Sequence, residues 1–215
     1  MKKYDYFLFD WDGTVAQTLD IWLECLKIPL QKQRHSFTDK EIGADFTLFK
    51  EFAISQRIAD IDAIIATATE LAALKTPDVP LYPGVQRLLE KLKKDGKKVA
   101  IVTTSLHAQI DSLVKKHELE TLIDAIVCGD DVANIKPHPE PLHLALSLLG
   151  GSPKQAVMIG DSDKDIEAAQ RAGMDSILVY PDRHRVFYNL DSLQALCPTH
   201  QIINLEDICT LQGYS

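Results

Sequence analysis

Short apolar runs alternate with helix-like segments over the second half of the chain. Four of the runs have the length of buried strands: 99–102, 123–127, 156–159 and 176–180. Segments with apolar residues at helical spacing lie beside and between them, at 84–95, 107–117, 139–149 and 163–172. Glycine follows three of these segments, as is common at helix C-termini. The alternation predicts a Rossmann-like α/β fold, in which helices flank both faces of a parallel sheet.

A different pattern follows the first predicted strand, which covers residues 4–9. Beyond it the apolar residues recur at helical spacing, in three sets: Leu19, Trp22, Leu23, Leu26 and Leu30; Phe46, Phe49, Phe52 and Ala53; Ile61, Ile64, Ile65, Ala68, Leu71 and Leu74. Thr38–Glu41 has the residues of a capping box, and Pro29 is expected to bend or end the first helix. This stretch shows no convincing strand pattern, so we predict a helical subdomain inserted directly after the first strand.

These patterns divide the chain into two parts. We predict an α/β core from residues 1–14 and 80–215 and a helical subdomain from residues 15–79. The proline-rich stretch 76–84 returns the chain to the core. Towards the C-terminus, residues 181–200 are poorly patterned and are predicted as loops with a short helix. A short strand at 202–203 and a helical turn are expected after them.

Polar residues follow several of the predicted strands where each strand ends. Asp10 and Asp12 follow the first strand, and other strand ends lead to Thr103, Thr104, Lys136, Asp161 and Asp165. The carboxyl ends of parallel strands meet at one edge of a sheet, where ligands of open α/β folds bind. We therefore expect three or four carboxylates, a hydroxyl and an ammonium to lie around one spot.

The carboxylates in this set are suited to a hard cation. Asp10, Asp161 and Asp165 offer oxygen ligands of the kind that Mg²⁺ prefers, with waters to complete an octahedron. A cation would also let a carboxylate approach a phosphate dianion, because it neutralises both. Lys136 and the backbone N–H groups of Gly13 and Thr14 are expected to assist. Thr103 could donate its hydroxyl to a phosphoryl oxygen.

Composition and charge restrict the kinds of partner. The chain has 215 residues and a net charge of −8, which argues against nucleic acid or an anionic membrane as the main partner. Cys25, Cys128, Cys197 and Cys209 are widely spaced, so we expect free thiols in a cytoplasmic protein. The apolar run after the N-terminus is short and broken by aspartates, so neither a signal peptide nor a membrane span is expected. The sequence does not determine an oligomeric state, and we expect a monomer or a weak homodimer.

Four motifs together resemble those of the haloacid dehalogenase (HAD) superfamily of hydrolases. The D-x-D-G-T motif corresponds to Asp10–Thr14, and the apolar strand that ends in a hydroxyl residue corresponds to Ile101–Thr103. The lysine followed by proline is Lys136–Pro137, and G-D-x-x-x-D is Gly160–Asp165. Each motif is weak alone, but their order and spacing match. The helical insertion resembles the C1-type cap of the phosphoglycolate phosphatase-like branch.

The resemblance implies an Mg²⁺-dependent phosphatase that acts on small phosphorylated metabolites, such as phosphoglycolate-like compounds or sugar phosphates. Asp10 would attack phosphorus to form an aspartyl-phosphate, and Asp12 would be the general acid and base. The implied phosphate-binding residues are Gly13, Thr14, Thr103, Thr104 and Lys136. The implied metal ligands are Asp10, the backbone carbonyl of Asp12, Asp161 and Asp165, the last either as a ligand or as the partner of Lys136. The cap would close over the site, with hinges at residues 14–18 and 76–83.

The chain departs from the resemblance at a few positions. Many relatives have Asp-Ser where Gln17 and Thr18 stand, so cap placement or substrate contact is expected to differ. His138 occupies a position where a small residue is common, and we expect an exposed loop histidine rather than a contact to Asp161. The segment around Gly43 resembles a substrate-contacting cap loop, although a plain helix junction explains it equally well.

Single residues distinguish the phosphatase prediction from other functions found on the same fold. Dehalogenases and phosphonoacetaldehyde hydrolases lack the second acid, Asp12, and the latter use a cap lysine, for which Lys40 is the candidate. Sugar-phosphate mutases, which are phosphotransferases, keep both acids but carry a cap histidine where this chain has Trp22. A phosphatase that acts mainly on a protein partner is a further alternative. A non-catalytic regulatory binding protein would have lost carboxylates, and none is lost here.

Overall fold

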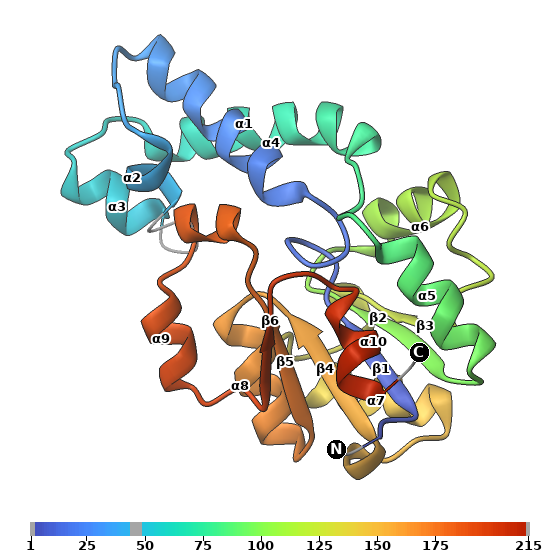
Figure 1. The fold of residues 1–215 in the computed structure, drawn as a ribbon. Coiled ribbons are helices and arrows are strands. Elements are labelled where there is room, and N and C mark those ends of the chain that lie inside the picture. The colour runs from blue at the N-terminus through green and yellow to red at the C-terminus, as the bar shows by residue number, and fades with distance from the viewer. Residues whose placement is uncertain (1–2, 44–48, 214–215) are drawn as a thin grey trace.

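A six-stranded parallel sheet forms the centre of the computed structural model, which describes residues 3–43 and 49–213 (Figure 1). The strand order is β3-β2-β1-β4-β5-β6. The strands are β1 Tyr6–Phe9, β2 Lys98–Val102, β3 Ala125–Val127, β4 Ala156–Gly160, β5 Asp175–Val179 and β6 His200–Ile202. Phe9 of β1 is in register with Ile101 of β2 and Ile159 of β4, so these three strands end at the same level. The predicted α/β fold is confirmed.

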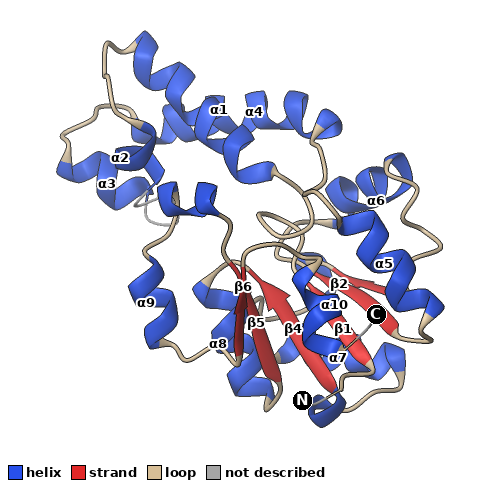
Figure 2. Ribbon diagram, viewed as in Figure 1, coloured by secondary structure: helices blue, strands red, loops and turns tan. Residues whose placement is uncertain are grey.

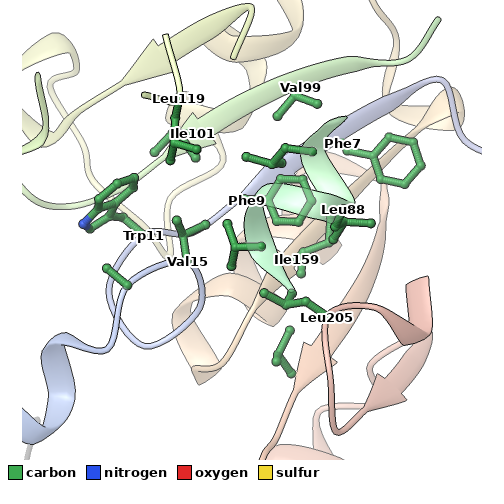
Figure 3. Close-up of a cluster of buried hydrophobic side chains, with 14 of the residues drawn as sticks. Phe7, Phe9, Trp11, Val15, Leu88, Val99, Ile101, Leu119, Ile159 and Leu205 are labelled. Atoms are coloured by element: carbon green, nitrogen blue, oxygen red, sulfur yellow. The ribbon is translucent and has the colours of Figure 1, made fainter. Parts of the chain in front are cut away.

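Helices cover both faces of the sheet, as the strand sequences require. The strands are apolar at successive positions because both of their faces are buried. On one face, Phe7, Phe9 and Ile159 belong to a hydrophobic cluster that includes residues of α5, α6 and α10. Figure 3 shows these three side chains beside Leu88 of α5. On the other face, Leu8 and Met158 pack against α7 and α8. These helices are α5 Val85–Lys94, α6 His107–Lys116, α7 Glu140–Leu149, α8 Asp163–Ala172 and α10 Asp207–Gln212.

The helical subdomain lies beyond the carboxyl ends of the strands, toward which the strand arrows point (Figure 2). Its helices are α1 Thr18–Lys32, α2 Asp39–Gly43, α3 Phe49–Ser55 and α4 Ile61–Lys75. They share a hydrophobic cluster that is separate from the clusters of the sheet and includes Leu23, Leu26, Phe52, Ile64 and Ala68. In the described part of residues 15–79 no strand occurs, in agreement with the prediction. Phe46 lies outside the described residues.

Local signals explain two features of these helices. Pro29 lies inside α1, which continues for a further turn, so it does not end the helix. The predicted capping box is present: the backbone N–H of Thr38 donates to Glu41 Oε2 at 2.7 Å, and the Glu41 N–H donates to Thr38 Oγ1 at 3.3 Å. This reciprocal pair satisfies two N–H groups that the first turn of a helix leaves without partners.

The two connections between core and helical subdomain are hydrogen-bonded to each other. Gln17 donates its backbone N–H to the Pro80 carbonyl at 2.9 Å and its side-chain amide to the Leu81 carbonyl at 2.8 Å. The N–H of Tyr82 donates to the Val15 carbonyl at 2.9 Å. Gln17, one of the departures from the family pattern, thus ties the outgoing connection to the returning one.

A second link between the two parts comes from the poorly patterned C-terminal region. As predicted, it contains a short helix, α9 Leu190–Ala195, and it also contains the 3₁₀ helix η5, Asp182–Val186. Arg183 of η5 pairs with Asp20 of α1 at 2.6 Å and with Asp39 of α2 at 3.3 Å. Phe187 packs into the hydrophobic cluster of the helical subdomain. Further 3₁₀ turns are η2 Thr76–Asp78, η3 Gly129–Asp131 and η4 Pro153–Gln155.

Two sequence predictions of a general kind can also be compared with the structure. All four cysteines are free thiols, as expected. Of the helices in the described part of the chain, none combines the length and the hydrophobicity that a transmembrane segment requires.

Candidate active site

The predicted acidic residues meet at the carboxyl edge of the sheet. Asp10 directly follows β1, Asp161 directly follows β4, and Asp165 lies in the first turn of α8. Carboxylate oxygens of these three residues lie within 4.8 Å of one another, and all three residues are buried. The parallel register explains this convergence, because β1 and β4 end side by side.

Lys136 lies among these carboxylates. Its Nζ donates to Asp10 Oδ1 at 2.7 Å, to Asp165 Oδ1 at 2.7 Å and to the Val102 carbonyl at 2.8 Å. An ammonium has three N–H donors, so each has a partner here. Burial alone would lower the pKa of Lys136, but Asp10 and Asp165 raise it above its usual value. Lys136 is therefore a fixed positive charge that holds Asp10 in place.

The second carboxylate oxygen distinguishes Asp165 from Asp161. Oδ2 of Asp165 accepts hydrogen bonds from the backbone N–H and the hydroxyl of Ser162, at 3.2 and 2.6 Å. With Oδ1 on Lys136, both oxygens of Asp165 are engaged, which favours the orienting role over that of a metal ligand. Asp161 Oδ1 accepts from the Thr14 hydroxyl at 3.2 Å, but Oδ2 makes no hydrogen bond of normal geometry among the described residues. The Tyr188 hydroxyl interacts with the Asp161 carboxylate and lowers its pKa, in opposition to the effect of burial.

The backbone approaches Asp161 very closely at Gly13. A Cβ atom at this position would lie 2.2 Å from Asp161 Oδ2, and the φ angle of +77° also favours glycine. The D-x-D-G-T motif thus needs its glycine for space as well as for backbone conformation. This arrangement places Asp161 Oδ2 against the Gly13 turn, 3.8 Å from His184 Nδ1.

The buried charges of the cluster do not balance. Burial raises the pKa of Asp10 to about 7, the charge of Asp165 adds to this effect, and Lys136 opposes it. Burial, followed by the charges of Asp10 and Asp165, raises the pKa of Asp161 well above its usual value. Three carboxylates with one ammonium would leave two negative charges in a buried site. A divalent cation on Asp161 Oδ2 would neutralise them, so these residues fit Mg²⁺.

Asp12 stands apart from this cluster. Its Oδ2 accepts a hydrogen bond from the Ser105 hydroxyl at 2.7 Å, and its side chain lines the pocket next to Asp10. Thr103 is buried, and its Oγ1 accepts from the Ser105 N–H at 3.1 Å. The loop after β2 therefore orients the second acid, a function of Ser105 that the sequence did not reveal.

The backbone amides of Gly13 and Thr14, which belong to the predicted phosphate site, have partners within the protein. The N–H of Gly13 donates to the Ala16 carbonyl at 3.0 Å, and that of Thr14 donates to the Trp11 carbonyl at 3.3 Å. These amides are engaged in the turn that leads into the helical subdomain, so a phosphoryl group would have to compete with the two carbonyls for them. Thr14 contributes through its hydroxyl instead, by holding Asp161.

A small pocket of 190 Å³ opens over the site. Its floor includes Asp10, Lys136 and Asp161, and α1 contributes Leu19 and Trp22. The remaining lining residues are Asp12, Thr104, Ser162, Lys164 and Tyr188. Trp22, one of the apolar residues at helical spacing in the predicted first helix of the subdomain, thus contributes to the wall of the pocket. A second pocket of 240 Å³ shares Asp12, Trp22 and Thr104 with the first.

His184 and Tyr188 were not predicted from the sequence. His184 is fully buried, its Nε2 lies 2.8 Å from the Tyr82 hydroxyl, and its Nδ1 lies 3.8 Å from Asp161 Oδ2. Burial lowers the pKa of His184 to about 4, so the ring is neutral near pH 7. Because the segment around His184 shows no clear hydrophobic pattern, the sequence did not indicate that this histidine would be buried beside Asp161.

His138, Gly43 and Lys40, for which the sequence allowed more than one role, lie away from the acidic cluster. The His138 ring is half exposed and lies 3.7 Å from Glu140, not next to Asp161, as expected. Gly43 ends α2, and a Cβ there would lie 2.3 Å from the Val186 carbonyl. This supports the helix-junction explanation, with glycine needed for close packing. Lys40 lines a separate pocket with Arg185 and Tyr188.

Comparisons with known proteins agree with this geometry. The family described as "Haloacid dehalogenase-like hydrolase" matches residues 7–179. A pyrophosphatase PpaX from Bacillus mycoides is 30% identical over 216 residues, which cover 94% of this chain and 99% of the relative.

Solved structures show the same fold. A haloacid dehalogenase-like protein of unknown function from Agrobacterium tumefaciens has a TM-score of 0.86 at 21% identity, with 98% of each chain covered. A putative phosphoglycolate phosphatase from Lactobacillus plantarum has a TM-score of 0.77 at 24% identity, with 97% of this chain and 99% of that chain covered. With the match over residues 7–179, these findings show that the chain belongs to the haloacid dehalogenase-like hydrolases and is an enzyme of that family.

Proposed function

We propose that this chain is an Mg²⁺-dependent phosphatase that hydrolyses phosphate monoesters of small metabolites through an aspartyl-phosphate on Asp10. The observation that carries the proposal is the cluster of Asp10, Asp161 and Asp165 around one ammonium, at the floor of a small pocket. Such a cluster suits a reaction in which a cation and a lysine together offset the charge of a phosphoryl group.

In the first step, an oxygen of Asp10 attacks phosphorus. Lys136 holds Oδ1, so Oδ2 is the attacking oxygen. The bond between phosphorus and the leaving-group oxygen breaks, and its electron pair stays on that oxygen. Asp12 donates a proton to this oxygen, in a position that Ser105 fixes through the hydrogen bond to Asp12 Oδ2. The step forms an aspartyl-phosphate and releases an alcohol.

In the second step, water attacks the phosphorus of the aspartyl-phosphate. Asp12, now ionised, takes the proton from this water. The bond between phosphorus and the Asp10 oxygen breaks, which restores the Asp10 carboxylate and releases inorganic phosphate. Asp161 would hold Mg²⁺ with Asp10 and the carbonyl of Asp12, and Asp165 would keep Lys136 in place. Mg²⁺ bound there would supply positive charge next to the phosphoryl oxygens.

We also propose that the helical subdomain acts as a cap. Leu19 and Trp22 of α1 contribute to the pocket wall, so movement of α1 would open or close the site. The hinges are expected at residues 14–18 and 76–83, where the two connections run side by side. A closed cap would exclude bulk water during formation of the aspartyl-phosphate.

A small substrate is supported by the size of the pocket. Its volume of 190 Å³, with 240 Å³ in the pocket that shares Asp12 with it, lies toward the lower end of the ~300–1,000 Å³ that is typical of pockets for drug-sized ligands. The relatives named pyrophosphatase and phosphoglycolate phosphatase have small, strongly anionic compounds in their names. Trp22, where a mutase would carry histidine, favours hydrolysis over phosphoryl transfer to a sugar.

The proposal is tested by phosphate release from 4-nitrophenyl phosphate, with Mg²⁺ and with EDTA. The natural protein is expected to need Mg²⁺, and Asp10→Asn is expected to lower kcat by roughly a thousandfold or more, because the nucleophile is lost. Asp163→Asn is the matched control, since Asp163 is an exposed aspartate close to the site that does not line the pocket. Full activity of Asp10→Asn, or equal activity in EDTA, would contradict the mechanism.

A further inference from the structure

The pocket over Asp10 contains one cation that the proposed mechanism does not use. Lys136 and Lys164 are the two basic residues in the described lining of this pocket. All three N–H donors of Lys136 are engaged, by Asp10, Asp165 and the Val102 carbonyl. Lys136 cannot bind another group without giving up one of these partners.

Lys164 differs from Lys136 in each of these respects. It is exposed and is the second residue of α8, between Asp161 and Asp165 in the sequence. Its backbone N–H donates to the Asp163 carboxylate at 2.9 Å, whereas its ammonium forms no ion pair with any described carboxylate. The positive end of the helix dipole lies in the same turn, so both features favour a negative charge at this place.

The surroundings make such a cation necessary for some substrates. The chain carries a net charge of −8, and the pocket is lined by Asp10, Asp12 and Asp161. Mg²⁺ and Lys136 would offset Asp10, Asp161 and Asp165, which leaves no positive charge for a second anionic group of the substrate. The other wall offers Leu19 and Trp22, which cannot stabilise a charge in the way that a lysine does.

We propose that Lys164 is a specificity-determining residue that binds a second anionic group on the leaving-group side of the substrate. The substrate class is then a small phosphate ester or anhydride in which a carboxylate or another phosphate lies a few atoms from the transferred phosphoryl group. This inference rests on the proposed phosphatase function and adds the part of the substrate that Asp10 and Mg²⁺ do not contact.

The test compares substrates with and without the second anionic group. The value of kcat/KM is measured for 2-phosphoglycolate, for pyrophosphate and for 4-nitrophenyl phosphate, whose leaving group carries no such group. Lys164→Gln is expected to lower kcat/KM for the first two, relative to 4-nitrophenyl phosphate, by about tenfold, mainly through KM. The decisive quantity is the ratio of kcat/KM for each of the first two substrates to kcat/KM for 4-nitrophenyl phosphate. Lys164→Arg keeps the charge and is expected to restore most of this ratio.

Lys154→Gln is the matched control, because Lys154 is also exposed but does not line the pocket. It removes the same charge from the molecule and is expected to leave the ratio unchanged. A fall for 2-phosphoglycolate alone assigns the second group to a carboxylate, and a fall for pyrophosphate alone assigns it to a phosphate.

Three results would overturn the inference: a ratio within twofold of the natural value in Lys164→Gln, an equal fall in Lys154→Gln, or a natural protein that hydrolyses only 4-nitrophenyl phosphate. If the natural protein hydrolyses none of the three substrates, the proposed phosphatase function itself is wrong. The two failures are therefore distinguishable.

Discussion

Asp161 occupies an unusual position among the buried carboxylates of the candidate active site. Asp10 and Asp165 each have a lysine contact, whereas Asp161 Oδ2 is buried and makes no hydrogen bond of normal geometry among the described residues. Leaving such an oxygen unsatisfied costs about 1–3 kcal/mol, and more for a charged group. That cost is recovered if a cation binds there, so an oxygen that is unfavourable without a cation would create the affinity for Mg²⁺.

Gly13→Ala tests this geometry, because the new Cβ would lie 2.2 Å from Asp161 Oδ2. The methyl group must displace the carboxylate, and we expect the apparent Mg²⁺ affinity to fall by about 10–100-fold, the range found when groups around a metal site are disturbed. The measurement is a titration of phosphatase activity and of thermal stability with Mg²⁺.

The control for backbone strain is Gly173→Ala. Gly173 has a φ of +71°, close to that of Gly13, but a Cβ there would meet no atom within 4 Å. Both changes should destabilise the fold by about 1–2 kcal/mol, because an L-residue is disfavoured at positive φ. Only the change at Gly13 should alter the Mg²⁺ dependence. Equal Mg²⁺ affinities in the two variants would show that crowding at Asp161 is unimportant.

Among the elements, η5 connects the core to the helical subdomain through Arg183. The guanidinium contacts Asp20 of α1 and Asp39 of α2, and all three side chains are more than a third exposed. Exposed pairs contribute about 0.2–1 kcal/mol each. We expect Arg183→Gln to weaken docking of α1 and α2 by about 1 kcal/mol, and thus to increase their amide hydrogen exchange up to about fivefold.

Arg185→Gln provides the comparison, because Arg185 pairs at 3.1 Å with Asp182 of its own segment. This variant should leave exchange in α1 and α2 unchanged. If both variants behave alike, the contacts of Arg183 do not hold the helical subdomain, and the packing of Phe187 in its hydrophobic cluster is sufficient.

The ionised carboxylate of Asp124 stabilises the start of β3, and its contribution depends on pH. Asp124 accepts hydrogen bonds from Lys93 at 2.7 Å and from the Val99 N–H at 2.9 Å. Burial opposes ionisation, but these hydrogen bonds outweigh it and lower the pKa of Asp124. A lowered pKa in the folded state means that the stabilisation is present above the unfolded pKa, about 4, and is lost as the pH falls below it.

We therefore expect Asp124→Asn to lower the free energy of unfolding at pH 7 by about 1 kcal/mol. The difference from the natural protein should shrink as the pH falls below about 4. Urea denaturation at several pH values measures both. Asp182→Asn, in which an 88% exposed carboxylate is removed, should have little effect at any pH. A pH-independent deficit in Asp124→Asn would mean that charge is not the cause.

How well the sequence predicted each element depends on where its contacts come from. The helix α8 has the predicted bounds, 163–172, because its signals are local: Ser162 caps its start and Gly173 follows its end. The strand ends also carried their acids as predicted, because parallel order follows from strand–helix alternation. Ser105 was not predicted to orient Asp12, since the two are 93 residues apart and only the tertiary fold joins them.

The position of η5 was missed for the same kind of reason. Its residues are polar except for Val186 and show no periodicity, because they are fixed by contacts to α1, α2 and Asp161 rather than by a pattern of their own. His184 is buried although it is a polar residue in a loop-like sequence. The amide contacts of Gly13 and Thr14 depend on how tightly the turn after β1 closes, which the motif alone does not specify.

At the scale of the whole molecule, the candidate active site lies between two hydrophobic clusters that are packed separately. The residues with the largest charge imbalance belong to the core, at the ends of β1 and β4, while the helical subdomain contributes pocket wall. Mg²⁺ should therefore stabilise the core directly. It should stabilise the helical subdomain only to the extent that the two parts unfold together.

Mg²⁺ is accordingly expected to raise the Tm of the natural protein and EDTA to lower it. At 100 times the Kd, binding adds about 2.7 kcal/mol, or roughly 5–10 °C for a chain of this size. Asp161→Asn should remove the shift, whereas Asp163→Asn, an exposed neighbour, should keep it. With a net charge of −8, weak binding of Mg²⁺ to the acidic surface is the competing explanation. It predicts the same shift in both variants, because each removes one negative charge from the same part of the molecule. A difference between them therefore locates the ion at the buried carboxylates.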